Sequence, residues 1–404
     1  MKAQWATKTL AEACQIKPPK SEARDKLANS AFVSFLPMEA MGIDQMFVTA
    51  TQTKSLSEVA GSYTYFAEGD VLLAKITPCF ENGKLGIASG LKNGVGFGSS
   101  EYIVFRPDKS VSKEWLYYFL SREAFRVEGA ARMSGAVGHK RVAKEFVETY
   151  PIPVPPLPEQ QRIVGILDEA FDGIATAKAN AEKNLQNARA LFESHLQSVF
   201  TQRGEGWVEK RLGDICQRVS VGHVGLTTQH YCDESQGIPF VRSQNVRPGH
   251  LDLQGVRHIT RAFHNQLKKS QLKSGDLLFV RVGANRGDCC SAPSGLGDIN
   301  CANIVFARPI EGNASFLERY CQSPHGRYQL LGMTTGSAQG VINTSSVAEL
   351  IVPLPSNSEQ QRIVETLDNL EIETQRLESI YQRKLAALDE LKKSLLHQAF
   401  SGSL

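Results

Sequence analysis

One six-residue segment occurs twice in the sequence, letter for letter. Glu-Gln-Gln-Arg-Ile-Val fills positions 159–164 and again 359–364, an offset of 200 residues in a chain of 404. Each copy begins a long amphipathic pattern that ends at a phenylalanine, Phe200 or Phe400. An offset of half the chain length is typical of a duplicated unit, so the sequence predicts two similar halves, each closed by a long helix.

Both long patterns have heptad spacing. Apolar residues recur at alternating steps of four and three, which is the spacing of a coiled-coil seam. The first seam is rich in alanine where the second carries leucine or tyrosine, and small side chains interdigitate well with large ones. We therefore expect the helices to pair antiparallel over roughly 60 Å; two separate amphipathic helices packed on globular domains are the alternative. The predicted seam positions are Ile163, Leu167, Ala170, Ile174, Ala177, Ala181, Asn184, Ala188, Leu191 and His195, and Ile363, Leu367, Leu370, Thr374, Leu377, Tyr381, Lys384, Leu388, Leu391 and Leu395.

The regions before the two helices repeat as well. Gly-Asp followed by three apolar residues stands at 69–73 and 275–279, and Ile-Val-Phe stands at 103–105 and 304–306. Each half begins at a tryptophan and passes through short β-branched runs that are typical of strands. After the strands we expect one helix (113–127 and 315–331), a glycine-rich loop (134–139 and 335–340), a final strand (147–154 and 350–355) and a proline-bearing linker, stiff and extended in the first half.

These elements predict an α+β fold with two similar globular domains joined by two long antiparallel coiled-coil helices, pseudo-twofold symmetric. The predicted boundaries are 1–157 for the first domain, 158–200 for the first helix, 201–357 for the second domain and 358–404 for the second helix. Residues 78–100 and 284–300 share almost nothing. Two related modules that read different targets would show such divergence, and so would neutral drift.

Several function classes lack their signatures here. No apolar run approaches the ~20 residues of a membrane span, and residues 1–10 lack the apolar core of a signal peptide. The eight cysteines have neither zinc spacing nor a disulfide framework, which indicates a reducing cytoplasm. The glycines at 94–98 lead into a strand, and Walker, methyltransferase and nuclease signatures are missing. Five histidines between 223 and 264 lack ligand spacing, so we expect no metal site.

Polar and basic residues gather in the loops of both halves. The net charge is only +3, but the globular halves are basic and the helices acidic, which is compatible with nucleic acid. Arginine and lysine read guanine in the major groove, and asparagine and glutamine read adenine. For any single residue, a phosphate contact or a solvated loop position is the alternative. The candidate DNA contacts are Lys75, Lys84, His139, Lys140, Arg141, Arg242, Gln244, Asn245, Arg281, Asn285, Arg286, Gln339 and Asn343.

The start of each helix is a candidate docking surface. Identical residues in matching places suit two copies of one partner, although helix capping and hinge geometry are the alternative. Apolar side chains outside the seam also need a cover. The candidate docking residues are Glu159, Gln160, Arg162, Phe171, Phe192, Glu359, Gln360 and Arg362.

This layout resembles the specificity subunits of type I restriction-modification systems, the HsdS family. The most specific matches are Pro-Leu-Pro-Glu-Gln-Gln-Arg-Ile-Val at 156–164, its imperfect repeat at 353–364, and Gln-Ala-Phe-Ser-Gly at 398–402. The resemblance implies two target recognition domains for double-stranded DNA and two spacer helices that dock two methyltransferase subunits.

The resemblance also implies that catalysis lies in partner chains. This chain would then bind no cofactor, while S-adenosylmethionine and ATP with Mg²⁺ would be held by methyltransferase and restriction subunits. We expect a bipartite, asymmetric DNA site whose unread spacer is fixed by the helices. A methyltransferase with fused recognition domains and a structural scaffold that does not touch DNA are the alternatives.

Overall fold

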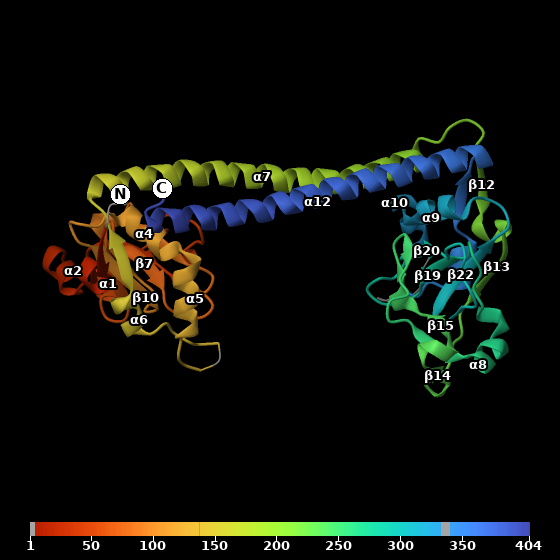
Figure 1. Ribbon diagram of the computed structural model, residues 1–404, viewed down its shortest axis with the longest axis horizontal. Coiled ribbons are helices and arrows are strands. Elements are labelled where there is room, and N and C mark those ends of the chain that lie inside the picture. The colour runs from red at the N-terminus through yellow and green to blue at the C-terminus, as the bar shows by residue number, and fades with distance from the viewer. Residues whose placement is uncertain (1–4, 137, 333–339) are drawn as a thin grey trace. The chain divides into compact units, whose positions relative to one another are not determined.

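The chain, described here by a computed structural model over residues 5–136, 138–332 and 340–404, divides into two compact units (Figure 1). Unit 1 comprises the chain up to Ala181 together with Arg383–Leu404, and unit 2 comprises Glu182–Gln382. Two helices have 45 residues each, α7 (Leu157–Thr201) and α12 (Asn357–Ser401), and each is divided between the two units. The predicted α+β fold with two long helices is confirmed.

Unit 1 is built on a five-stranded sheet in the order β2-β10-β7-β8-β4, with β10 antiparallel to both of its neighbours. A second sheet has the order β5-β3-β9-β6, in which β3 and β9 run parallel. The strands are β2 (Cys14–Ile16), β3 (Phe32–Leu36), β4 (Phe47–Val48), β5 (Gln52–Ser55), β6 (Thr64–Ala67), β7 (Val71–Ala74), β8 (Leu85–Ala88), β9 (Val95–Gly98) and β10 (Tyr102–Pro107). The helices are α1 (Leu10–Ala13), α2 (Ser21–Lys26), α3 (Leu56–Val59), α4 (Lys113–Ser121), α5 (Glu123–Ala131) and α6 (Lys144–Thr149).

Unit 2 repeats this scaffold. Its first sheet has the order β13-β22-β19-β20, which corresponds to β2-β10-β7-β8, and its second sheet, β14-β18-β15-β21, again contains one parallel pair. The strands are β13 (Cys216–Val221), β14 (Tyr231–Cys232), β15 (Gly237–Val241), β18 (Arg257–Thr260), β19 (Leu277–Val280), β20 (Cys289–Ser291), β21 (Asn300–Cys301) and β22 (Ile304–Pro309), with a small hairpin of β16 (Val246–Arg247) and β17 (His250–Leu251). The helices are α8 (Arg261–Gln266), α9 (Ala314–Gln322), α10 (Pro324–Gly332) and α11 (Thr344–Ala348). The dissimilar segments 78–100 and 284–300 therefore still supply equivalent strands, β8 and β20.

The prediction of one helix in each domain is wrong, because two shorter helices stand in its place, α4 and α5 in unit 1 and α9 and α10 in unit 2. Arg122, between α4 and α5, has extended backbone angles (φ −61°, ψ 138°), and its guanidinium donates to the carbonyl of Phe119. Ser323 has the same conformation (φ −60°, ψ 151°) before Pro324. A residue that precedes proline is driven out of the helical region, so the second break is built into the sequence.

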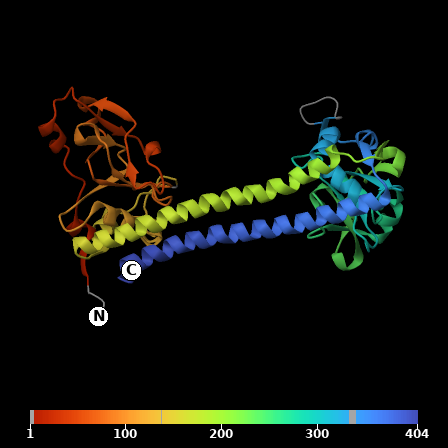
Figure 2. The same ribbon diagram turned by 90° about the horizontal axis from the view of Figure 1, so that it is seen from above.

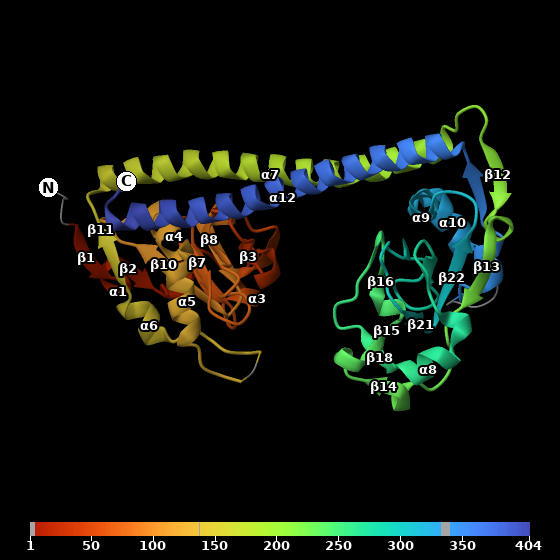
Figure 3. The same cartoon turned by 45° about the vertical axis from the view of Figure 1, so that its right-hand side comes forward.

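The final strand predicted over 147–154 is confirmed for 151–154, whereas helix α6 includes 147–149, and the proline-bearing segment before α7 is therefore not a free linker. It forms strand β11 (Pro151–Val154), which pairs antiparallel with β1 (Ala6–Thr9), near the start of α7 (Figure 3). In unit 2, β12 (Val208–Arg211) and β23 (Ile351–Leu354) pair in the same way. Proline lacks a backbone N–H but is tolerated in an edge strand, where alternate residues supply the donors.

The predicted antiparallel helix pairing is confirmed within each unit. In unit 1, Lys178 of α7 forms an ion pair with Asp389 of α12 at 2.6 Å, and Ile163 shares a core with Leu396. In unit 2, Arg189 pairs with Glu378 at 3.0 Å. The two helices lie side by side in both views (Figure 1 and Figure 2). The twofold relation between the domains stays a prediction.

The heptad frame predicted for the seam holds at Ala181, Ala188 and Leu388 but fails at alternate positions in its later part. Leu191, Leu377 and Leu391 are 50%, 37% and 46% exposed, whereas the residues one position later are partly buried. An α-helix has 3.6 residues per turn and drifts by about 20° per heptad relative to a 3.5-residue repeat. The buried stripe therefore moves by one residue along each helix.

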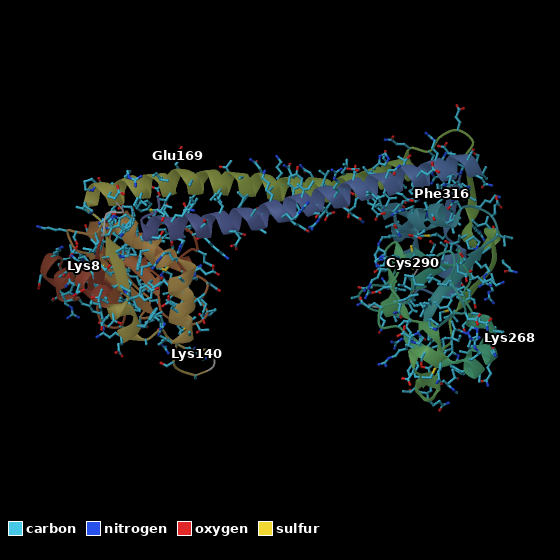
Figure 4. All side chains as sticks on the ribbon, in the orientation of Figure 1. Lys8, Lys140, Glu169, Lys268, Cys290 and Phe316 are labelled. Carbon is cyan, nitrogen blue, oxygen red and sulfur yellow. The ribbon has the colours of Figure 1, made fainter. Side chains whose placement is uncertain are left out.

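Each unit completes its core with the end of a long helix. The Phe400 ring lies 4.3 Å from that of Trp115 and 5.3 Å from that of Phe119, in the core of unit 1. Phe200 lies 5.4 Å from Phe316 in unit 2, and Figure 4 places Phe316 close to α12. The globular domains are thus incomplete without these helix ends.

Candidate nucleic-acid interface

An ion pair between an arginine and a buried aspartate joins the central strands of each unit. Arg106 on β10 donates two hydrogen bonds of 2.8 Å to Asp70, which precedes β7, and these bonds raise the pKa of the guanidinium. Arg308 on β22 binds Asp276 in the same way, with two bonds of 2.7 Å. Two parallel N–H···O bonds hold both partners in one geometry. The strands β7, β10, β19 and β22 therefore present their loops from a rigid base.

In unit 1, two of the predicted DNA contacts share one carboxylate. Arg141 donates bonds of 2.9 and 2.7 Å to Glu101, and Lys75 lies 3.9 Å from the same carboxylate. The hydrogen bond from Arg141 holds the pKa of Glu101 below its usual value. The backbone joins the same segments, because Val142 N–H donates to the Lys75 carbonyl at 2.9 Å. The structure thus brings Lys75 and Arg141 together, with part of their charge neutralised.

The other basic candidates of unit 1 differ in exposure. His139 and Lys140 are exposed, and Figure 4 shows Lys140 on the side of the domain that faces away from α7. Lys84 is half-buried and donates to the carbonyl of Met38 at 2.8 Å. Among these residues, His139 and Lys140 are best placed for a ligand.

The second unit brings its predicted loops together through equivalent bonds. Ile342 N–H donates to the Arg281 carbonyl at 3.1 Å. This bond is equivalent to the one from Val142 to Lys75 in unit 1, and the two donor residues are 200 positions apart. Arg286 donates to the carbonyl of Gly340. Asn285 is exposed on the same loop, whereas Gln339 lies outside the described residues.

The prediction that Asn245 and Asn343 read adenine through bidentate contacts is wrong. Asn245 is 2% exposed, accepts from Arg242 N–H at 3.0 Å and donates to the Asp252 carbonyl at 3.0 Å. The side-chain oxygen Oδ1 of Asn343 caps α11 by accepting from Ser346 N–H at 2.8 Å. Bidentate reading needs both amide atoms free, so these residues shape their turns. Gln244, next to Asn245, is exposed.

A groove rich in lysine was missed by the sequence reasoning. It has a volume of about 550 Å³ and lies among the end of β2, the start of β6, the end of β7, the start of β10 and α6. Of its lysines only Lys75 was predicted, and the segment Lys17-Pro18-Pro19-Lys20 was the overlooked signal. We call this feature the lysine groove, defined by Lys17, Lys20, Ser62, Thr64, Lys75 and Lys144.

The docking roles predicted for Gln160 and Gln360 are contradicted by burial. Gln160 is fully buried, donates to the carbonyls of Ser110 (2.7 Å) and Pro155 (2.8 Å), and accepts from Ser112 N–H at 2.8 Å. Gln360 accepts from Asn313 N–H at 2.7 Å and donates to Pro355. These amides clamp the start of each long helix to the cap of a domain helix, as the hinge alternative required.

Replacing Gln160 by leucine is expected to destabilise unit 1 by about 2–4 kcal/mol, because buried backbone groups lose their partners. A role in surface docking alone would leave the stability of the fold unchanged. Gln161→Leu is the matched control, since Gln161 is exposed and the change should stay within about 0.5 kcal/mol. Urea unfolding of both variants gives the comparison, and equal midpoints would contradict the clamp.

The aromatic docking candidates pack inside their own units. Phe171 lies 5.4 Å from the ring of Tyr118, and the Arg319 guanidinium lies over Phe192 at 5.6 Å. Neither phenylalanine therefore forms the open apolar surface that was predicted for docking. Glu159 with Arg162 and Glu359 with Arg362 form partly exposed ion pairs, so their docking role stays a prediction.

Metal ligands, cysteines and apolar helices were also compared with the predictions over the residues that the structure describes. No group of three or more histidine, cysteine or acidic residues there could hold a metal ion. All eight cysteines are free, and burial raises the pKa of Cys216 and Cys290 to about 12. None of the described helices combines the length and the apolar character needed to cross a membrane.

The fold and these loops define a duplicated α+β protein that carries different basic and polar loops on one scaffold. The chain belongs to the family described as type I restriction modification DNA specificity domain, whose model matches residues 2–186 and 204–384. It is 38% identical over 161 residues to the type I restriction enzyme EcoAI specificity subunit of Escherichia coli, covering 40% of this chain and 27% of that protein. The match thus spans about a quarter of that relative's length. The EcoKI specificity subunit of Escherichia coli K12 is 24% identical, with 82% of this chain and 76% of that protein covered.

Solved structures show the same fold. A chain from a structure described as the structural basis underlying complex assembly and conformational transition of the type I R-M system has a TM-score of 0.77 and 20% identity, covering 100% of this chain and 99% of that one. The HsdS subunit from Thermoanaerobacter tengcongensis has a TM-score of 0.69 and 19% identity, covering 100% and 98%.

Proposed function

We propose that this chain is the DNA-reading, non-catalytic subunit of a type I restriction-modification complex. Each domain reads one half of a bipartite, asymmetric site in double-stranded DNA. The observation that carries the proposal is one scaffold built twice, with Lys75, His139 and Lys140 on one copy and Gln244, Arg281 and Asn285 at the loops of the other. Different side chains on equivalent loops would recognise different bases. The names of the relatives support this role.

The proposal places catalysis in partner chains. Two methyltransferase subunits would dock along α7 and α12, with S-adenosylmethionine bound by them and ATP with Mg²⁺ bound by the restriction subunits. Exposed Ile372, Leu377 and Ile380 on α12 offer apolar area for such a contact. The helices would also fix the length of the unread DNA between the half-sites.

The test is to produce the chain with a methyltransferase partner and map the methylated bases across a genome. One motif with two unlike half-sites and a fixed gap is expected. His139→Ala/Lys140→Ala should relax only the half-site read by unit 1, and Gln244→Ala only the other. Methylation that is independent of the chain, or a single continuous palindrome, would rule the proposal out.

A further inference from the structure

The lysine groove carries positive charge that its surroundings neutralise only in part. Lys144 pairs with Glu148 at 3.3 Å, and Lys75 shares Glu101 with Arg141. Lys20 donates only to an uncharged group, the carbonyl of Gly61, at 2.7 Å. Among the described residues, no ion pair uses Lys17 or Lys20. Two of the four ammonium groups are thus left for an anion.

The backbone at one edge of this groove is held in an uncommon conformation. Lys17 has φ 59° and stands directly before Pro18, while its N–H donates to the Val104 carbonyl at 2.8 Å. The left-handed region disfavours residues with a Cβ and costs on the order of 1 kcal/mol or more, so it persists where the surroundings fix it. In unit 2 the equivalent strand, β13, continues to Val221, whereas β2 ends at Ile16. The early end of β2 belongs to unit 1 alone.

Like charges lie near Lys20, and Glu148, the carboxylate in the groove lining, is paired with Lys144. Burial lowers the pKa of Lys20, and the like charges of Arg24 and Lys17 lower it further. A bound anion would reverse this effect by stabilising the ammonium form. Hydroxyl groups of Ser62 and Thr64 in the same lining can donate hydrogen bonds to anionic oxygens.

We propose that the lysine groove holds the phosphate backbone of double-stranded DNA, with Lys17 and Lys20 as its main contacts. The inference rests on the proposed function and adds the surface that positions unit 1 on the duplex. An ammonium group is a compact charge on a flexible stem, which suits phosphate oxygens better than the fixed pattern of a base edge. Contacts of this kind set position and affinity but carry no sequence information.

The test compares DNA binding by the full chain, assembled with its methyltransferase partner, with and without Lys17→Ala/Lys20→Ala. Each phosphate contact contributes about 0.9 to the slope of log K against log salt, so the slope should fall by about 1.8. At 0.15 M salt this corresponds to about thirty-fold weaker binding. The loss should be equal for target DNA and for unrelated DNA, and the methylated motif should stay the same.

Two further variants control for net charge and folding. Lys17→Arg/Lys20→Arg keeps both charges and should keep the slope. Lys92→Ala/Lys109→Ala removes two exposed lysines that do not line the groove and should leave the slope within error. An unchanged slope for Lys17→Ala/Lys20→Ala, or a changed motif at one half-site, overturns the groove proposal while the proposed function stands. If the unaltered complex shows no preference for any DNA sequence, both fall.

Discussion

Replacing Phe400 by alanine is expected to destabilise unit 1 by about 3–5 kcal/mol. Phe400 is 9% exposed, and its ring contacts those of Trp115 and Phe119. These two residues precede unit 2 in the sequence, whereas Phe400 follows it. A loss of this size is a large share of the 5–15 kcal/mol that holds a typical domain together. Urea unfolding followed by tryptophan fluorescence measures it, because Trp115 lies against the altered side chain.

The reciprocal variant tests whether the end of each long helix stabilises only the unit in whose core it is buried. Phe200→Ala should weaken unit 2, where Phe200 packs against Phe316 and Tyr320. Leu391→Ala removes a side chain that is 46% exposed and should change stability by no more than about 0.5 kcal/mol. Hydrogen exchange assigns each loss to its unit. A loss of protection in unit 2 on changing Phe400 would show that the assignment is wrong.

Inserting four residues into both α7 and α12 is expected to lengthen the unread DNA spacer and leave both half-sites unchanged. Four residues add about 6 Å of helix, or about two base pairs at 3.4 Å each. They also add close to one full turn, so the buried stripe keeps its direction. Suitable positions lie between Lys178 and Arg189 in α7 and between Glu378 and Asp389 in α12, because ion pairs bracket both. Mapping of methylated sites gives the new spacer length.

Two-residue insertions at the same positions are the matched control. They turn everything beyond them by about 200°, which moves the buried stripe off its partner, so methylation should be lost. If the half-site sequences changed with helix length, or the spacer did not, the helices would not be what sets the spacing.

The parts of the fold that follow from repetition could be predicted from the sequence. The long helices, their antiparallel pairing and the common scaffold rest on patterns that recur in one chain. What failed were the continuity of the domain helices and the first residue of the final strand. Arg122 has extended backbone angles that end α4, and the predicted final strand begins only at Pro151 because α6 extends to Thr149.

The candidate site was less predictable, because an exposed and a buried amide look alike in a sequence. The repeated sequence predicts Gln160 at the surface, yet its side-chain oxygen accepts from a backbone N–H 48 residues earlier. Asn245 was taken for a base reader and instead holds its own turn. The lysine groove combines five separate segments, so the local pattern Lys17-Pro18-Pro19-Lys20 indicates only one of its edges.

The clamp formed by Gln160 and Gln360 has a consequence for how such a gene can change. Both joints use the same six residues and make the same kind of bond to the cap of the neighbouring domain helix. A crossover within either coding segment, with a gene that encodes the same six residues there, would exchange the globular part of a domain in frame and preserve the joint. New combinations of domains could then arise by recombination in one step, without passing through unfolded intermediates.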